Sequence, residues 1–524
     1  MKKILLYLII SYSSLITAQY NPEIFSNLYT GGSQFNGISN LRYSTKLNNQ
    51  LFFNLQNQNS YDLYATDGTV ANTRLLKTVT QVLNLVTFDN HVYFSFKDNT
   101  NGVELWKTDG TVSGTTRISI LGGNAIAAHD YMVAGNKLFF ASANAATPFV
   151  NHLYSIEPGS SVPVLLNANL NDVGGIQKYN NKVVFYGTEI ANSSNTTELY
   201  ISDGTQAGTY LLKDIKPGAA GSNPKSFIPF QNKLYFSADD GTNGREIWVT
   251  DGTTAGTTLL KDINPGLGNS FVRLIAGIFN GKMYFSANGA LWSTDGTVNG
   301  TTLFMNVDPG SGDNFVTLNN KLVFLAEDGI HGYEIWTSDG TSQNTTLLLD
   351  ISPGANSSLY ELLQSNAICT NQLFFNADNQ SFGIEPWVTD GTVAGTHLVE
   401  DINTINGSVD YETRYELLNG NIYFTANPGN GRQLYKMESC SNLGVENILV
   451  NTFKIYPNST KDIINIETTA EITKVEIYNT LGQLVNTISE NKKQIDLSAL
   501  NSGIYLLTIK TTENQRSVQR FLKE

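Results

Sequence analysis

An aromatic residue stands three positions before an acidic one nine times between Tyr64 and Tyr435, and this repeat constrains the fold more than any other feature. The pairs are Tyr64/Asp67, Trp106/Asp109, Tyr154/Glu157, Tyr200/Asp203, Trp248/Asp251, Trp292/Asp295, Trp336/Asp339, Trp387/Asp390 and Tyr435/Glu438. All five tryptophans of the chain occupy the aromatic position. Consecutive pairs are about 42 to 51 residues apart, a spacing typical of repeat architectures.

One well-formed unit has the pattern of short strands separated by turns. The segments 234–236, 247–250 and 258–263 are rich in apolar, aromatic and β-branched residues, and 226–230 supplies a possible fourth strand. No run has the length or the 3.6-residue period of a helix. Four strands in about 46 residues are typical of one blade of a β-propeller. We therefore expect an all-β chain with eight or nine four-stranded blades.

Several of the expected strands carry consecutive apolar residues, as in Leu138-Phe139-Phe140 and Leu373-Phe374-Phe375. Such strands need cover on both faces, which a blade between two neighbouring blades has. The repeated aromatic residue, which covers roughly 150 to 250 Å² when buried, should therefore lock each blade to a neighbour.

The acidic position is followed by Gly and Thr in seven units, and another Thr stands six residues after each Asp. The seven aspartates are Asp67, Asp109, Asp203, Asp251, Asp295, Asp339 and Asp390. We interpret the motif as a turn, because Asp accepts backbone hydrogen bonds, Gly tolerates positive φ and the Thr hydroxyl closes the loop. The alternative role is a metal ligand or general base, but catalysis needs one well-placed site and not seven copies.

A second acidic pattern recurs in three units. Its members are Asp98/Gly102/Glu104, Asp240/Gly244/Glu246 and Asp328/Gly332/Glu334. A calcium loop of the EF-hand type needs more oxygen ligands at a different spacing. We expect solvated hairpin turns at these positions, with calcium binding as the alternative.

The ninth unit stops at Glu438 without a last strand. The segment 24–32 has the sequence of the missing strand and its turn. We expect this N-terminal strand to close the ring, because closure leaves no open sheet edge.

Residues 104–111 read Glu-Leu-Trp-Lys-Thr-Asp-Gly-Thr and match the motif that names the ELWxxDGT-repeat family of bacterial surface and secreted proteins. The resemblance spans residues of roughly 20 to 440 and implies a propeller-like repeat domain without a settled activity. The third unit departs most, with Ile156-Glu157-Pro158-Gly159 in place of the motif.

The N-terminus has the pattern of a secretory signal peptide over residues 1–18, with Lys2-Lys3, an apolar stretch from Ile4 and a small residue at Ala18. Its apolar part is too short to span a membrane, and no later segment is long enough. We expect the propeller to comprise residues 19–440. Without Lys2 and Lys3 the formal charge changes from −13 to −15, and such acidity disfavours nucleic acid as a partner.

The chain has two cysteines, Cys369 and Cys440. An oxidising compartment permits a disulfide between them, and burial as free thiols is the alternative.

After Cys440 the pattern changes. The segments 453–458, 475–479, 482–485, 496–498 and 503–505 resemble, in this order, the motifs of the type A sorting domain of the type IX secretion system. The match covers about residues 449–524 and departs at Ser459, where the family commonly has Pro, and at Asn514-Gln515, where it often has Gly. The resemblance implies a translocation signal for the type IX machinery, with the passenger released or attached to the cell surface. The residues themselves predict a small β-sandwich within 441–524; a structural cap for the propeller is the alternative.

The sequence offers no candidate catalytic, cofactor-binding or metal-ligating residue. It lacks a serine nucleophile elbow, a zinc-binding His-Glu-x-x-His, a Gly-rich phosphate loop and the context of a cysteine nucleophile. The five histidines, which we expect at the surface, are His91, His129, His152, His331 and His397. Carboxylate pairs for glycoside cleavage could be assembled from different blades, but spacing along the chain does not reveal them.

The leading functional hypothesis is a noncatalytic, monomeric propeller, secreted or displayed on the cell surface, that binds a glycan or a protein through loops at one end of its ring. The alternative is a polysaccharide-processing hydrolase or lyase on the same scaffold. The candidate binding loops are two inserts, 143–152 and 187–197, because binding residues often lie on loops held by a rigid frame.

Overall fold

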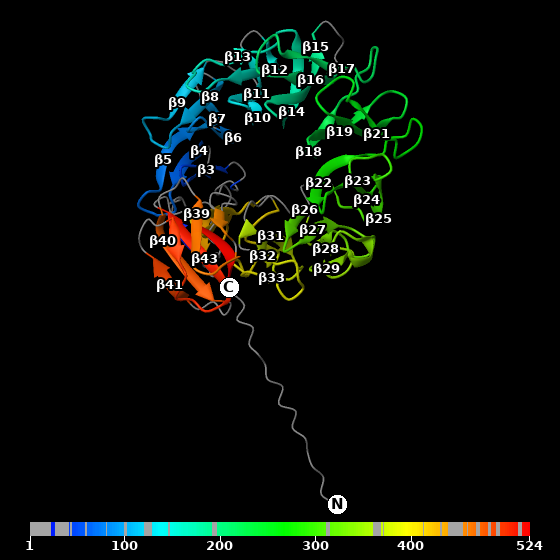
Figure 1. Ribbon diagram of the computed structural model, residues 1–524. Coiled ribbons are helices and arrows are strands. Elements are labelled where there is room, and N and C mark those ends of the chain that lie inside the picture. Colours follow the sequence, from blue (N-terminus) through cyan, green and yellow to red (C-terminus); the bar gives the residue numbers. More distant parts are fainter. Residues whose placement is uncertain are drawn as a thin grey trace, which may run out of the picture. The chain divides into compact units, whose positions relative to one another are not determined.

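The computed structural model of the protein divides into two compact units, Met1–Cys440 and Ser441–Glu524, and its strands are labelled in Figure 1. The structure describes residues 22–26, 41, 44–57, 60–79, 81–98, 102–119, 128–144, 147–190, 196–310, 315–359, 368–369, 371–411, 413–429, 432–438, 454–457, 459–467, 472–479, 484–488, 493–511 and 516–524. The predicted signal peptide lies outside these residues.

The described residues of the first unit form nine four-stranded sheets, which we call blades 1 to 9. Blade 1 contains β2 (Ser44–Leu47), β3 (Gln50–Asn57), β4 (Ser60–Thr66) and β5 (Arg74–Val79). Blade 2 contains β6 (Gln81–Phe88), β7 (His91–Asp98), β8 (Gly102–Thr108) and β9 (Thr116–Ser119). Blade 3 contains β10 (His129–Ala134), β11 (Lys137–Asn144), β12 (Thr147–Ile156) and β13 (Val164–Leu165). Blade 4 contains β14 (Leu170–Tyr179), β15 (Lys182–Glu189), β16 (Glu198–Ser202) and β17 (Thr209–Lys213). Blade 5 contains β18 (Lys225–Phe230), β19 (Lys233–Asp239), β20 (Arg245–Thr250) and β21 (Thr258–Lys261).

The remaining blades have the same order of strands. Blade 6 contains β22 (Arg273–Phe279), β23 (Lys282–Ala287), β24 (Ala290–Thr294) and β25 (Thr302–Met305). Blade 7 contains β26 (Phe315–Leu318), β27 (Lys321–Ala326), β28 (Glu334–Ser338) and β29 (Thr346–Leu349), with a short 3-10 helix, η1 (Ser342–Asn344), before its last strand. Blade 8 contains β30 (Ile368–Cys369), β31 (Gln372–Asp378), β32 (Ile384–Thr389) and β33 (His397–Leu398). Blade 9 contains β34 (Glu416–Leu418), β35 (Asn421–Ala426), β36 (Gln433–Glu438) and β1 (Glu23–Ser26).

Neighbouring blades are joined by hydrophobic clusters. Nine clusters each combine residues of one blade with residues of the next, including one that joins blade 9 to blade 1. The nine blades therefore close into a ring within this unit. In Figure 1 the first strands of the blades lie along the inside of the ring and the fourth strands along its outside. The β-propeller predicted from the sequence is confirmed, with nine blades.

The repeated aromatic residue has the role predicted for it. In all nine blades it packs in the cluster shared with the preceding blade. Trp248, Trp336 and Trp387 are buried, whereas Trp106 and Trp292 are half-buried at the edge of their clusters. Each blade is thus held to its predecessor by one large ring.

The N-terminal strand closes the ring as predicted. β1 pairs antiparallel with β36, with Glu23 opposite Lys436 and Ile24 opposite Tyr435. The last blade is therefore built from both ends of the repeat region. Residues 27–32 of the predicted segment lie outside the described residues.

The second unit is a β-sandwich. One sheet has the order β37-β39-β42, from β37 (Lys454–Tyr456), β39 (Ile463–Glu467) and β42 (Gln494–Asp496). The other has the order β38-β44-β43-β40-β41, from β38 (Ser459–Thr460), β44 (Arg516–Lys523), β43 (Gly503–Thr511), β40 (Ile472–Asn479) and β41 (Leu484–Ile488). Ile464 and Ile466 of the first sheet pack in one core with Val475, Leu507 and Phe521 of the second. Within the described residues of the chain, no helix is long and apolar enough to cross a membrane.

Candidate functional site

The Asp-Gly-Thr motifs form the predicted turns. In blade 5 the carboxylate Oδ1 of Asp251 accepts hydrogen bonds from the Thr253 amide (2.9 Å) and hydroxyl (2.6 Å). The Thr253 hydroxyl accepts from the Gly256 amide (2.9 Å), and the Thr257 hydroxyl donates to the Thr253 carbonyl (2.7 Å). The Asp-to-Thr pair of bonds also occurs at Asp67, Asp109, Asp203, Asp295, Asp339 and Asp390. The threonine hydroxyl is the main cause that lowers the pKa of the Asp251 carboxyl.

These turns also join neighbouring blades, which the sequence reading missed. Their backbone carbonyls accept hydrogen bonds from the blade before. Asn419 donates through Nδ2 to the carbonyl of Asp67 (2.8 Å), and Asn319 donates likewise to that of Asp390 (2.8 Å). The Tyr179 hydroxyl donates to the carbonyl of Asp251 (2.7 Å). These donors lie at or beside the turn between the first and second strands of their blade. The turns between first and second strands and the Asp-Gly-Thr turns therefore lie at the same end of the propeller. We call this end the turn face.

The glutamates of the second acidic pattern are not in solvated turns, and that prediction is wrong for them. Glu104, Glu246 and Glu334 are buried. Glu334 accepts hydrogen bonds from the amides of Ile351 (3.0 Å) and Ser358 (3.1 Å) and from the Ser358 hydroxyl (2.6 Å). Its partners lie in the connection from blade 7 to blade 8. Glu246 accepts in the same way from the Ile263 amide (2.8 Å) and the Ser270 hydroxyl (2.5 Å), so Glu246 and Glu334 each hold the segment that leads to the next blade.

Two further glutamates, at the equivalent position two residues before the repeated aromatic, make the same contacts. Glu198 accepts from the Ser222 hydroxyl (2.6 Å), and Glu385 accepts from the Ser408 amide (2.8 Å). Burial raises the pKa of Glu334 and of Glu385 to about 7. Four of these glutamates, Glu198, Glu246, Glu334 and Glu385, lie 23 or 24 residues before their serine. The sequence displays this spacing, which could have revealed the contact.

Two of the three aspartates of the second pattern, Asp240 and Asp328, sit in turns, whereas Asp98 is the last residue of β7. Oδ1 of Asp240 accepts hydrogen bonds from the amides of Thr242 and Asn243 (both 2.8 Å). Asp328 accepts from the His331 amide (3.0 Å), and its second oxygen lies 2.9 Å from Nδ1 of His331. Within the described residues, no group of three or more His, Cys, Asp or Glu side chains could hold a metal ion.

One of the five histidines, His152, does not lie at the surface as predicted. His152 is buried, and its ring nitrogens lie 2.6 Å from the Leu170 carbonyl and 2.7 Å from the Thr147 hydroxyl. It stands two residues before Tyr154, at the position of the buried glutamates, and it contacts Leu170, the first residue of the next blade. His91, His129, His331 and His397 are half-buried.

The two inserts do not form open binding loops where the structure describes them. Most of 143–152 extends the β11–β12 hairpin, in which Ser142 pairs with His152 and Asn144 with Thr147. Residues 187–189 continue β15, whereas residues 191–195 lie outside the described residues. Cys369, buried on β30, is disulfide-bonded, so the free-thiol alternative is wrong for it. The other cysteine of the chain, Cys440, lies outside the described residues.

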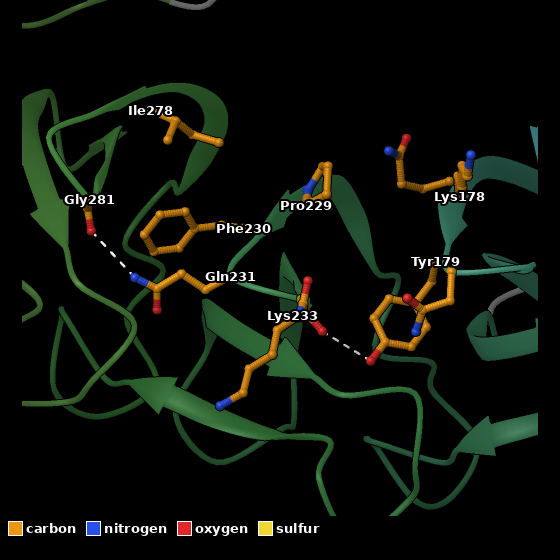
Figure 2. Close-up of a pocket in the computed structure, with 11 residues that line it drawn as sticks. Lys178, Tyr179, Pro229, Phe230, Gln231, Lys233, Ile278 and Gly281 are labelled. Carbon is orange, nitrogen blue, oxygen red and sulfur yellow. Dashed lines mark hydrogen bonds between the residues drawn. The ribbon is translucent and has the colours of Figure 1, made fainter. Parts of the chain in front are cut away.

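A pocket of about 610 Å³ opens on the turn face across blades 4, 5 and 6. It is lined by Gln177, Lys178, Tyr179, Asn180, Pro229, Phe230, Gln231, Asn232, Lys233, Ile278 and Gly281. Figure 2 shows these side chains around the pocket. The lining offers amides, a phenol, two ammonium groups and apolar surface, which suit hydrogen bonding, packing against a sugar or aromatic ring, and attraction of anions.

The fold places these residues together through equivalent positions of three blades. In each blade one lining residue of the first strand pairs with the second residue of the second strand. The pairs are Lys178 with Val183, Pro229 with Leu234, and Ile278 with Met283. The innermost strands of three consecutive blades therefore supply one wall each. Residues about 50 positions apart meet only because the ring sets these strands side by side.

The turn of blade 5 is unusual. Gln231 has a φ of 48°, in the left-handed region, and Nε2 of its side chain donates to the Gly281 carbonyl of blade 6 (3.4 Å) (Figure 2). In the seven other described turns between first and second strands, this position holds Asn, Asp or Gly, which tolerate such a φ better than Gln. The glutamine thus brings a longer amide to the pocket at a cost of about 1 kcal/mol or more in backbone strain.

A second pocket on the same face, of about 590 Å³, lies between blades 3 and 4. Lys137, Lys182, Asn136, Asn181 and Asp203 are among its lining residues. The Lys137 ammonium donates to the Gly204 carbonyl (3.0 Å) and lies 3.1 Å from the Glu157 carboxylate. Amides and lysines thus line the turn face from blade 3 to blade 6.

Comparison with known proteins identifies the second unit. Residues 454–524 match the family described as the secretion system C-terminal sorting domain. The chain carries a type IX secretion sorting domain. This domain directs the protein to the cell surface or the extracellular space.

The similar solved structures are remote in sequence. PorZ, a surface component of the type IX secretion system of Porphyromonas gingivalis, shares 12% identity over 98% of this chain and 88% of its own, with a TM-score of 0.26. The propeller domain of the Trilobed protease from Pyrococcus furiosus shares 13% identity over 60% of this chain and 98% of its own, with a TM-score of 0.33. A puromycin-hydrolyzing peptidase from Mycobacterium tuberculosis shares 8% identity over 59% of this chain, with a TM-score of 0.35, and this chain spans about half (52%) of its length. No curated protein matches the chain.

Proposed function

We propose that the protein is a noncatalytic glycan-binding propeller of the ELWxxDGT-repeat type. In this proposal a signal peptide over residues 1–18 is removed, residues 19–440 form the monomeric binding domain, and the sorting domain delivers it to or beyond the cell surface. The pocket across blades 4, 5 and 6 is the observation that carries the proposal.

The lining chemistry supports a sugar ligand. The amides of Gln231 and Asn232 each offer donors and an acceptor, which pair with sugar hydroxyls. Pro229 and Ile278 present apolar surface against which the C–H face of a sugar ring packs. The Tyr179 hydroxyl lies 3.1 Å from the Asn232 carbonyl, so the pocket floor is held by contacts between blades and does not have to form on binding.

Two isoleucines allow a matched test. Ile278 lines the pocket and is 48% exposed, whereas Ile368 is 44% exposed on the first strand of blade 8 and is not a lining residue. Each pairs with the second residue of the following strand, Met283 or Leu373. Ile278→Trp should fill the pocket, and Ile368→Trp should add the same bulk elsewhere on the ring.

The experiment is a panel of neutral and acidic polysaccharides, with retention and product formation measured on the same samples. We expect retention by the wild-type protein and by Ile368→Trp, and at least about tenfold weaker binding by Ile278→Trp, because its indole would displace the ligand. Equal binding by both variants would refute the pocket as the site. New reducing or unsaturated chain ends would favour a hydrolase or lyase, and retention on protein ligands alone would favour a protein-binding module.

A further inference from the structure

The turn face carries an arc of lysines. The first residue of the second strand is a lysine in five consecutive blades, 3 to 7. These residues are Lys137, Lys182, Lys233, Lys282 and Lys321. In the other four blades the same position holds Gln50, His91, Gln372 and Asn421. The fold therefore accepts uncharged side chains here, and the charge is confined to one side of a nearly repetitive ring.

The outer members of the arc have structural contacts. Lys137 donates to the Gly204 carbonyl (3.0 Å), and Lys321 donates to the Gly391 carbonyl (3.4 Å). Both bonds join neighbouring blades. They explain two of the five lysines.

The three central lysines have no such explanation. In blades 4 and 6 the contact to the next blade comes instead from Tyr179 and Tyr284, whose hydroxyls donate to carbonyls of Asp251 and Gly340. None of the described residues makes a hydrogen bond or a close ion pair with the ammonium groups of Lys182, Lys233 or Lys282. Three cations on consecutive blades thus have no direct partner among the residues that the structure describes.

Acidic groups near these lysines are already occupied. The threonine hydroxyls of the turns are the main cause that lowers the pKa of Asp203, Asp251 and Asp295, and the charges of Lys182, Lys233 and Lys282 lower it further. Those carboxylates accept the threonine hydrogen bonds of the turn, for example from Thr253 to Asp251. The ammonium groups act on them at a distance and remain able to contact a ligand.

Resting on the proposed function, we infer that the glycan is an anionic polysaccharide. Lys178 and Lys233 line the pocket itself, and Lys182 and Lys282 extend the cationic row on either side of it. The mature chain has a formal charge of −15 after the loss of Lys2 and Lys3, so it would otherwise repel a polyanion. A row of lysines on consecutive blades suits a polymer whose charges recur along its length, because several contacts then add.

The test compares polygalacturonate with its methyl-esterified form, which has the same backbone without the charges. We expect the purified full-length protein to bind polygalacturonate, with affinity that falls steeply as NaCl rises to about 0.5 M. Exposed ion pairs contribute roughly two- to fivefold each to binding, so Lys182→Gln/Lys233→Gln/Lys282→Gln should weaken it about tenfold or more.

A matched triple variant, Lys107→Gln/Lys213→Gln/Lys225→Gln, removes the same charge outside the arc and should bind like the wild type. Equal affinity for both polymers would overturn the anionic inference and leave glycan binding intact. Failure to bind any glycan would instead overturn the proposed function. Binding of single-stranded DNA as tight as that of polygalacturonate would also overturn the inference, because the surface would then select charge and not a glycan.

Discussion

Closure of the propeller depends on β1, and a single side chain of that strand provides a quantitative test. Phe25 is 8% exposed and packs between blade 9 and blade 1 with Phe53 and Leu418. Its ring meets that of Tyr423 edge to face, with centroids 5.3 Å apart. The adjacent Ile24 is 46% exposed on the same strand.

Phe25→Ala should lower the free energy of unfolding by about 3 kcal/mol, the lower end of the range for buried Phe→Ala changes, because a terminal strand can adjust around the cavity. Ile24→Ala keeps the backbone pairing of β1 but removes a half-exposed side chain, so its cost should stay below about 1 kcal/mol. Urea unfolding followed by tryptophan fluorescence measures both changes. Hydrogen exchange of the β36 amides, which pair with β1, should accelerate in the first variant. If the two variants shift the transition equally, β1 does not close the ring through its buried side chain.

Two further predictions concern the buried glutamates and the repeated turns. Burial raises the pKa of Glu334 and Glu385 to about 7 from an ordinary value of 4.5. Between these two pH values the folded state retains protons that the unfolded chain releases. The free energy of unfolding should therefore fall as the pH rises from about 4.5 to about 7. Thermal unfolding across this range should show the trend, and Glu334→Gln should flatten it; an unchanged slope would contradict the assignment. Gly252 and Gly266 both have positive φ, 79° and 98°, but a methyl group at Gly252 would lie 2.5 Å from the Tyr179 ring, whereas the space at Gly266 is open. Gly252→Ala should therefore lower the free energy of unfolding by about 2 kcal/mol more than Gly266→Ala does. Chemical denaturation compares the two, and equal losses would show that only the backbone conformation matters.

The sequence predicted those features that recur at a fixed spacing. The aromatic column, the Asp-Gly-Thr turns and the displaced strand at Ile24 could all be read from the chain, because each satisfies a local or nearest-neighbour rule. The sequence did not reveal the hydrogen-bond partners of Glu334, although their spacing is regular. To predict them, one must know that the connection to the next blade returns to the third strand, where Glu334 lies. His152, which sequence reasoning placed at the surface, occupies the equivalent position and contacts the Leu170 carbonyl of the next blade.

The pocket could not have been predicted from spacing at all. Its walls come from Lys178, Pro229 and Ile278, which differ in chemistry and meet only through the ring. The predicted inserts, by contrast, looked like loops because they interrupt the repeat. One of them extends a hairpin, where its backbone groups pair across β11 and β12.

In a ring of repeated units, symmetry separates structural from functional residues. Whatever every blade needs must recur in most blades, as the aromatic column and the threonine-capped turns do. A binding site confined to one side of the ring must break that repetition, since it uses positions that only a few blades supply. Gln231 breaks it in blade 5, and the three central lysines of the arc break it in blades 4, 5 and 6, the blades across which the pocket lies. This coincidence of departures from the repeat, and not the repeat itself, is the physical basis for placing the binding site on the turn face of blades 4 to 6.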